Sequence, residues 1–209
     1  MFIQSLLRHF KTAALLCFAL PVVHAAVELD GMSFEDTVTV ESVKLQLNGV
    51  GWRKRGYNKV DISGLYLPQK ATTLEALEAM PGPKRIQLAL LQEISGSTAS
   101  RYFLNDFEAS ATKEEFGQVI NEVFQMGAIY NSLPKIKKGD IVAIDVIPGK
   151  GVCATINGNP IMVPGTNTRY INSDLMGKIF LRMYVGGKTP AELRNNLLGV
   201  SRSMRDAGK

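Results

Sequence analysis

The chain has 209 residues, of which 45% are hydrophobic, and a formal net charge of +5. Its only dense basic groups are residues 53–55 and 135–138, and neither is interleaved with the aromatic residues that nucleic-acid binding favours. Nucleic acid is therefore excluded as an expected partner. The length suits a single domain with a substantial hydrophobic core.

Residues 1–25 are predicted to be a secretory signal peptide. Arg8 and Lys11 supply a positive end, residues 12–23 form a short apolar run, and small residues mark a cleavage site that ends at Ala25. Cleavage leaves 184 residues with a net charge of +3, because two lysine or arginine residues are removed. We expect a protein exported across the inner membrane to the periplasm. No later stretch is long and apolar enough for stable membrane insertion.

Cleavage would also remove both histidines, His9 and His24. The mature domain, residues 26–209, would then have no imidazole for a serine or cysteine triad, a histidine-bearing zinc site or a general base. Cys153 would be the only cysteine left, so no internal disulfide is expected. No motif for a metal or another cofactor is present, and we predict none.

The first half of the domain shows strand patterns. Residues 38–47 alternate, with Val43, Leu45 and Leu47 on one face, and residues 59–67 follow as an antiparallel partner. Next come a short helix and a buried strand. A capping box at residues 72–75 opens the helix, the Pro-Gly-Pro run at 81–83 ends it, and the strand covers residues 85–92.

Helices dominate the rest of the chain, interrupted by a strand and a hairpin. The expected helices cover residues 97–109, 112–130 and 173–184, with a last one from 189 that ends at Gly199; the strands cover 140–147, 152–156 and 161–163, the last two around an Asn-Gly turn. This order predicts an α+β fold in which helices pack on one face of an antiparallel sheet.

Strand parity singles out Arg53. If the first strand continues without a bulge, Arg53 extends the row of Leu45, Leu47, Gly49 and Gly51 and points toward the core. A buried guanidinium needs an anion or water, and the two glycines leave space for a close approach. On the next strand Tyr66 is expected to aim its hydroxyl at the same space, which would form a receptor for a carboxylate with an apolar tail.

Two structural alternatives stay open for Arg53. The residue lies in water beyond a glycine bulge, or it pairs internally with Asp61. Lys54 and Arg55 are most simply explained as the solvated end of the hairpin.

The segments 47–53 and 59–67 resemble the paired signature of the chalcone isomerase family, a Gly-x-Gly-x-Arg strand followed by a strand that ends Gly-Leu-Tyr-Leu. The resemblance continues in order through the central helices to residues 180–186. It implies an open-faced β-sandwich, with helices layered on one side of a large antiparallel sheet and a ligand cleft between them. The family contains enzymes that cyclise chalcones, fatty-acid-binding proteins, and bacterial members whose role is mostly unassigned.

Position by position, the resemblance keeps the arginine that holds the ligand's anionic oxygen, Arg53. The other positions depart from the enzyme: they read Asp61 for a threonine, Ala99 for a tyrosine with Tyr102 nearly a turn later, Asn105 or Asp106 for an asparagine, and Met183, followed by Tyr184, for a late threonine or serine. The negative charge of Asp61 would oppose a developing enolate. We therefore predict no catalytic residues.

The leading hypothesis is a non-catalytic binding protein for a small amphipathic carboxylate, such as a fatty acid, or another apolar ligand. Its predicted ligand-binding residues are Arg53, Tyr66, Tyr102 and Asn105. One alternative is an isomerase, an intramolecular lyase acting on an unknown substrate. Another is a module with a closed cleft whose partner is a different envelope protein, and no pattern in the sequence says which protein that would be.

Overall fold

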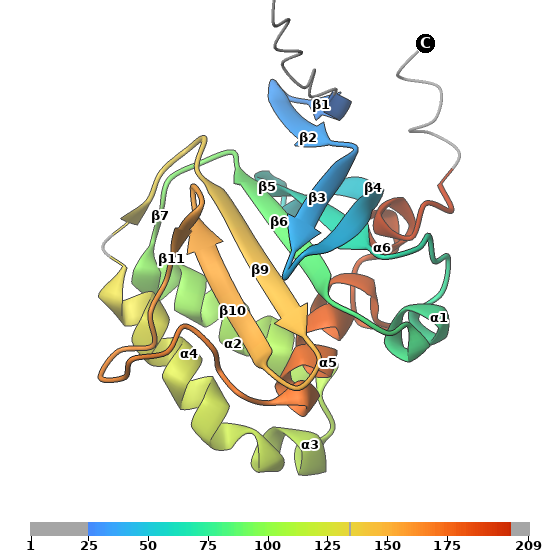
Figure 1. The fold of residues 1–209 in the computed structure, drawn as a ribbon. Helices are drawn as coiled ribbons and strands as arrows, with labels where there is room; N and C mark the ends of the chain where they lie inside the picture. The colour runs from blue at the N-terminus through green and yellow to red at the C-terminus, as the bar shows by residue number, and fades with distance from the viewer. Residues whose placement is uncertain (1–24, 134, 202–209) are drawn as a thin grey trace, which may run out of the picture.

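The computed structural model describes residues 25–133 and 135–201, which form a large curled sheet with helices against it (Figure 1). The main sheet has seven strands in the order β11-β10-β9-β6-β5-β4-β3, and every neighbouring pair is antiparallel. The strands are β3 (Thr37–Val40), β4 (Val43–Arg55), β5 (Asn58–Leu67), β6 (Lys84–Leu90), β9 (Ile141–Ile147), β10 (Gly151–Ile156) and β11 (Asn159–Pro160). Two small pairs add β1 (Ala25–Leu29) with β2 (Met32–Glu35), and β7 (Ile94–Ser95) with β8 (Lys135–Ile136).

The helices lie on one side of this sheet, as Figure 1 shows for α2, α4 and α5. They are α1 (Leu74–Ala79), α2 (Gly96–Ser110), α3 (Lys113–Gln118), α4 (Ile120–Ser132), α5 (Asp174–Val185) and α6 (Ala191–Leu197). The prediction of an α+β fold with one helical layer is confirmed. Residues 1–24, which hold nearly all of the predicted signal peptide, lie outside the described residues, so that signal stays a prediction.

Each face of the sheet carries its own hydrophobic core. On the helix face, strand residues such as Leu65 and Leu88 pack against helix residues such as Phe107 and Phe180. On the opposite face, which we call the outer face, a smaller cluster surrounds Phe34 of β2; its other buried members are Val40, Leu45, Leu47, Val50, Ile62, Tyr66, Ala89, Ile147 and Cys153. A side chain of the sheet contacts the helices only if it lies on the helix face.

The prediction of one continuous strand over residues 38–47 is wrong. The structure divides it into β3 and β4, which form a hairpin closed by Glu41 and Ser42. Both residues have left-handed backbone angles, with φ of 48° and 66°, the geometry that two-residue hairpin turns require. Neither residue is a glycine, and the alternation of apolar residues continues across the turn. The sequence pattern therefore gives no signal for this turn.

The helix predicted over residues 112–130 is also divided. The capping box at Thr112 and Glu115 is present and opens α3, but the chain leaves regular helix at Val119 and resumes as α4. Val119 is 1% exposed, and its N–H donates to the carbonyls of both Glu115 and Phe116. The break therefore places an apolar side chain in the core without leaving its amide unpaired.

Turn and capping signals near the end of the chain are mostly confirmed. Asn157 and Gly158 form the hairpin turn, and Gly199 takes a left-handed conformation just after α6. The predicted cap of α6 by Thr189 is wrong, because this hydroxyl donates instead to the carbonyls of Arg182 and Met183 at the end of α5. Thr189 thus ties the two final helices together. None of the helices in the described ranges combines the length and apolar character needed to cross a bilayer.

Candidate ligand-binding site

Arg53 lies on the helix face, although the parity argument that placed it there was wrong. Leu47 pairs with Tyr66 and Gly49 pairs with Leu65, so Asn48 is an extra residue that forms a β-bulge in β4. Leu45 and Leu47 therefore face the outer core, whereas Gly49, Gly51 and Arg53 face the helices. The bulge is held by the Asn48 amide, which donates to the carbonyls of Ala71 and Leu197.

The space beside Gly49 and Gly51 is occupied by helix α6. A Cβ atom on Gly49 would lie 2.0 Å from the carbonyl oxygen of Asn196, and one on Gly51 would lie 3.0 Å from the Asn196 Cβ. These glycines let α6 pack directly on β4. The prediction that they leave room for a ligand is wrong.

The Arg53 guanidinium is surrounded by three oxygen-bearing side chains. Its Nε donates to Asp61 at 2.9 Å, its Nη1 donates to the Tyr184 hydroxyl at 3.1 Å, and the same Nη1 lies 3.8 Å from Asp106. Burial alone would lower the pKa of Arg53, but the nearby Asp61, Tyr184 and Asp106 raise it above its ordinary value. Arg53 is therefore a permanent cation. No residue in the described ranges accepts a hydrogen bond from its Nη2.

Asp61 is the built-in counter-charge of Arg53. Its side chain has no exposed surface, and its second oxygen accepts a hydrogen bond from the Ser63 hydroxyl at 2.8 Å. Arg53 and Asp61 are also direct cross-strand partners in β4 and β5. The internal pairing of Arg53 with Asp61, which the sequence left open, is therefore present. The charge of the guanidinium is already balanced without a ligand.

Arg55 repeats this arrangement one step nearer the surface. It has the same orientation as Arg53 and makes a two-pronged contact with Asp106 of α2, with Nη1 donating to Oδ1 at 2.8 Å. Its guanidinium also lies over the ring of Tyr102, 4.6 Å from the centroid. Arg55 is therefore part of the site, and its interpretation as a solvated hairpin end is wrong; Lys54 does reach the surface, where it pairs with the exposed Glu192.

Two small cavities adjoin Arg53 on the helix face. The inner cavity has a volume of about 50 Å³ and mostly apolar walls; it is lined by Arg53, Leu88, Leu90, Ile94, Ala99, Tyr102, Phe103, Tyr130, Ile136, Val142, Ile144, Phe180, Met183 and Tyr184. The outer cavity has a volume of about 100 Å³ and a more polar rim that includes Arg55, Asp106, Ser110 and Lys188. Arg53 and Met183 line both cavities, so they form the boundary between them.

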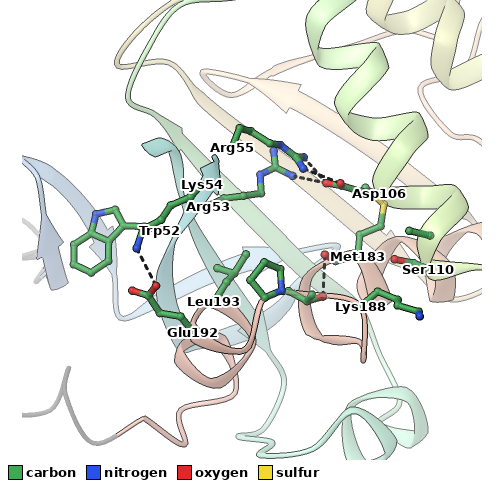
Figure 2. Close-up of a pocket in the computed structure, with 13 residues that line it drawn as sticks. Trp52, Arg53, Lys54, Arg55, Asp106, Ser110, Met183, Lys188, Glu192 and Leu193 are labelled. Atoms are coloured by element: carbon green, nitrogen blue, oxygen red, sulfur yellow. Dashed lines mark hydrogen bonds and ion pairs between the residues drawn. The ribbon is translucent and has the colours of Figure 1, made fainter. Parts of the chain in front are cut away.

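Figure 2 shows the outer cavity, with Arg53 and Arg55 directed from β4 toward Asp106 on α2 and with Met183 beside them. Lys54 and Glu192 lie farther along the same cavity, where they form an ion pair at 2.9 Å. The charged side chains thus lie mostly around the outer cavity, and apolar residues dominate the lining of the inner one. An amphipathic molecule would match this polarity with its head outward and its tail inward.

Two of the predicted ligand-binding residues do not lie in this site. Tyr66 faces the outer core, because residues 62, 64 and 66 of β5 share the face opposite Asp61 and Leu65. Its hydroxyl is buried without a hydrogen-bond partner, and the backbone of Glu35 approaches without reaching bonding geometry. Asn105 is exposed on α2, one residue before Asp106, whose side chain reaches Arg53 and Arg55. Tyr102 lines the inner cavity.

The structure adds residues that the sequence analysis did not assign to the site. Tyr184 and Tyr130 reach Arg53 or its cavity from α5 and α4, and Asp106, which the sequence left as an alternative to Asn105, holds Arg55. Helical spacing gave a usable signal for Asp106, because it lies one turn after Tyr102 and three residues after the buried Phe103. Tyr184 and Tyr130 carried no local signal, since their roles depend on how the helices dock.

The two tyrosine hydroxyls near Arg53 are poor proton donors near neutral pH. Burial raises the pKa of Tyr184 to about 12, and it also raises the pKa of Tyr130 above its ordinary value. Cys153 lies on the outer face, and burial raises the pKa of its thiol to about 11. Efficient acid–base catalysis needs a group whose pKa lies near the working pH. Within residues 25–133 and 135–201, no group of three histidine, cysteine or carboxylate side chains is placed to hold a metal ion.

Comparison with protein families matches residues 26–199 to the chalcone isomerase-like family, and the chain belongs to this family. No curated protein matches the chain in sequence. Among solved structures, the crystal structure of a fatty-acid-binding protein from Arabidopsis thaliana is similar, with a TM-score of 0.67. The match covers 84% of this chain and 96% of the plant protein at 16% identity, which establishes a shared fold and confirms the predicted open-faced β-sandwich.

Proposed function

We propose that this protein is a non-catalytic binding protein for a small amphipathic molecule, with a polar or acidic head at Arg53 and an apolar tail in the inner cavity. One observation carries the proposal: Arg53 is the only charged residue among those that line this apolar cavity in the described part of the chain. Few polar groups in an otherwise apolar pocket are typical of ligand sites, where the polar groups fix orientation.

The hydrogen-bonding capacity of Arg53 supports a head-group contact at this point. Asp61 accepts from Nε and Tyr184 accepts from Nη1, which leaves Nη2 without an acceptor in the described residues, and Arg53 lines both cavities. A carboxylate, or a neutral oxygen acceptor, would complete the guanidinium fork there. The fatty-acid-binding protein of the same fold agrees with an acyl chain as the tail.

The cavity must widen to accept a long chain. Its volume of about 50 Å³ is well below the roughly 300–1,000 Å³ of pockets that enclose drug-sized ligands. Met183 separates the two cavities, and an unbranched methionine side chain repacks at low cost. Rotation of Met183 would join the inner and outer cavities into one channel.

The test compares two arginines that differ in their face of the sheet. Arg53→Lys keeps a positive charge beside Asp61 but loses the planar fork, so we expect affinity for decanoic acid to fall about tenfold or more. Arg85→Lys is the matched control, because Arg85 pairs with Asp145 on the outer face and touches neither cavity. It should change affinity less than about twofold.

Native mass spectrometry and lipid extraction of protein purified from the periplasm form the second arm. The proposal expects an apolar acid or related lipid to co-purify with wild type and to be depleted from Arg53→Lys. If no such molecule co-purifies and wild-type protein binds neither decanoic acid nor decanol, the binding function is rejected. Turnover of a chalcone panel above that of Arg53→Lys would instead support an isomerase.

We also propose that the protein is exported to the periplasm, on the basis of the signal-like residues 1–25. Cell fractionation followed by N-terminal sequencing tests this point. The expected mature chain begins at Ala26, inside β1, and keeps the pairing with β2 from Val27 onward. Recovery of full-length protein from the cytoplasmic fraction alone would contradict export.

A further inference from the structure

The two carboxylates beside Arg53 differ in how firmly they are held. Asp61 has no exposed side-chain surface and is tied by both Arg53 and Ser63. Asp106 is 22% exposed, lies on helix α2 and lines the outer cavity. Of the two, Asp106 is therefore the one that can turn into water without leaving a buried charge behind.

Asp106 occupies the space between two guanidinium groups. It accepts two hydrogen bonds from Arg55, and its Oδ2 lies 3.8 Å from Nη1 of Arg53 (Figure 2). Arg53 and Arg55 come from the same strand and both point to the helix face, so their charges would repel without a shared anion. The contact is an anion site whose present occupant is part of the chain itself.

Charge balance shows why this occupant matters for binding. Arg53 and Arg55 carry two positive charges, and Asp61 and Asp106 carry two negative ones, so the cluster is neutral. An acidic ligand that joined this neutral cluster would add an unbalanced negative charge. If Asp106 turns outward, the ligand head takes its place and the balance is restored.

We infer that Asp106 is an internal competitor for the head group, and that an anionic ligand binds by displacing its carboxylate from Arg53 and Arg55. This inference rests on the proposed function and deepens it: the preferred ligands are anions, and Asp106 sets how tightly they bind. The affinity for an acid is lower than the two arginines alone would give, whereas the affinity for a neutral ligand of the same length does not depend on displacement.

The decisive variant is Asp106→Asn, which keeps the shape of the side chain and removes its charge. We expect decanoic acid to bind about tenfold more tightly or better, since one competing charge close to two guanidiniums is lost at a partly solvated site. Decanol should bind within about twofold of wild type. Isothermal titration of both compounds measures the two effects on the same protein.

Glu108→Gln is the matched control. Glu108 lies on α2 two residues after Asp106, is exposed and lines neither cavity, and the substitution makes the same change in net charge. It should leave decanoic acid affinity within about twofold of wild type. If both variants gained the same affinity for decanoic acid, the cause would be the change in net charge alone, and the competitor role of Asp106 would be overturned.

A double variant guards against a folding artefact. Asp106→Asn combined with Arg55→Met removes both members of the outer pair, so the second guanidinium is lost and the gain in acid affinity should disappear. Thermal unfolding with and without decanoic acid checks that each variant folds. The inference is overturned if Asp106→Asn folds and binds the acid no tighter than wild type, or more weakly, while wild type still binds; absence of acid and alcohol binding in every variant instead rejects the binding function itself.

Discussion

Arg53 and Arg85 lie on opposite faces of one sheet, and each has an aspartate as its direct cross-strand partner. Arg85 uses Nε and Nη2 in a two-pronged contact with Asp145, at 2.6 and 2.8 Å, and neither cavity reaches it. Arg53 gives only its Nε to Asp61, its Nη1 faces Tyr184 and Asp106, and the residue lines both cavities. Under the proposed function, the difference is that Arg53 has an incompletely used fork with space beside it, whereas Arg85 has neither.

The largest expected effect comes from removing each arginine. Arg53→Ala leaves Asp61 fully buried without a counter-charge and should lower the free energy of unfolding by about 3–5 kcal/mol. Arg85→Ala should cost less, about 2–3 kcal/mol, because Asp145 keeps some exposure. Urea denaturation measures both values.

The double variant Arg53→Met with Asp61→Asn sharpens this comparison. It removes both charges together, so it should recover more than half of the loss caused by Arg53→Ala. Equal stability of Arg53→Ala and wild type would show that the Arg53–Asp61 pair is not buried as described.

Glycines on the two faces provide the next test. Gly49→Ala places a methyl group 2.0 Å from a backbone oxygen of α6, so we expect a loss of about 3 kcal/mol or more. Gly64→Ala on the outer face meets the ring of Phe34 at 2.7 Å, and this side chain can shift, so a loss of about 1–2 kcal/mol is expected. Thermal unfolding ranks the two. The reverse order would mean that α6 is not packed on Gly49.

A pair of buried tyrosines gives a smaller effect. Tyr184→Phe removes an acceptor from Arg53 and should cost about 1 kcal/mol. Tyr66→Phe removes a hydroxyl that has no partner, so stability should change by less than about 0.5 kcal/mol or rise. Chemical denaturation at pH 7 compares them, and a larger loss for Tyr66→Phe would contradict the assignment of the two faces.

The pH dependence of Tyr184 can be measured with the same variants. Its pKa is raised from 10.0 to about 12, so the folded state keeps a proton that the unfolded state loses. Stability should therefore fall as the pH rises from 10 toward 12, and this fall should be shallower in Tyr184→Phe. Unfolding curves at pH 9, 10 and 11 measure the slope, and identical slopes would remove Tyr184 from the titration.

The last prediction concerns the reactivity of Cys153 and leaves stability unchanged. Burial raises the pKa of this thiol from 9.0 to about 11, so at pH 8.5 the folded protein should contain about a hundredfold less thiolate than the unfolded chain. Iodoacetamide labelling of Cys153, followed by peptide mapping with and without urea, reports the ratio. Rapid labelling in the native state would show that the outer core is open at β10.

Sequence patterns anticipated much of the fold because the relevant interactions are local. The capping box at Thr112, the turn at Asn157 and Gly158, and the glycine after α6 each involve residues a few positions apart. Apolar periodicity likewise located most helices. No local signal marks the hairpin turn at Glu41 and Ser42 or the helix break at Val119. Ordinary residues take those conformations there because of tertiary packing.

The site itself was anticipated only in part. Arg53 and Tyr102 were assigned to it, but strict alternation along β4 and β5 gave the wrong relation between Arg53 and Tyr66. One extra residue, Asn48, reverses the face of every later side chain in β4. A bulge of this kind is stabilised by α6 and the segment at Ala71, both distant in sequence, so no local window reveals it.

By itself the sequence determined the α+β class, the family signature around Arg53, and the lack of histidine in residues 26–209. Only the tertiary structure decided which carboxylates meet Arg53, which tyrosines share its cavity, and what occupies the space beside Gly49 and Gly51. The reason is physical: backbone preferences and periodicity depend on near neighbours, whereas charge pairing and cavity shape depend on residues brought together from β4, β5, α2, α5 and α6.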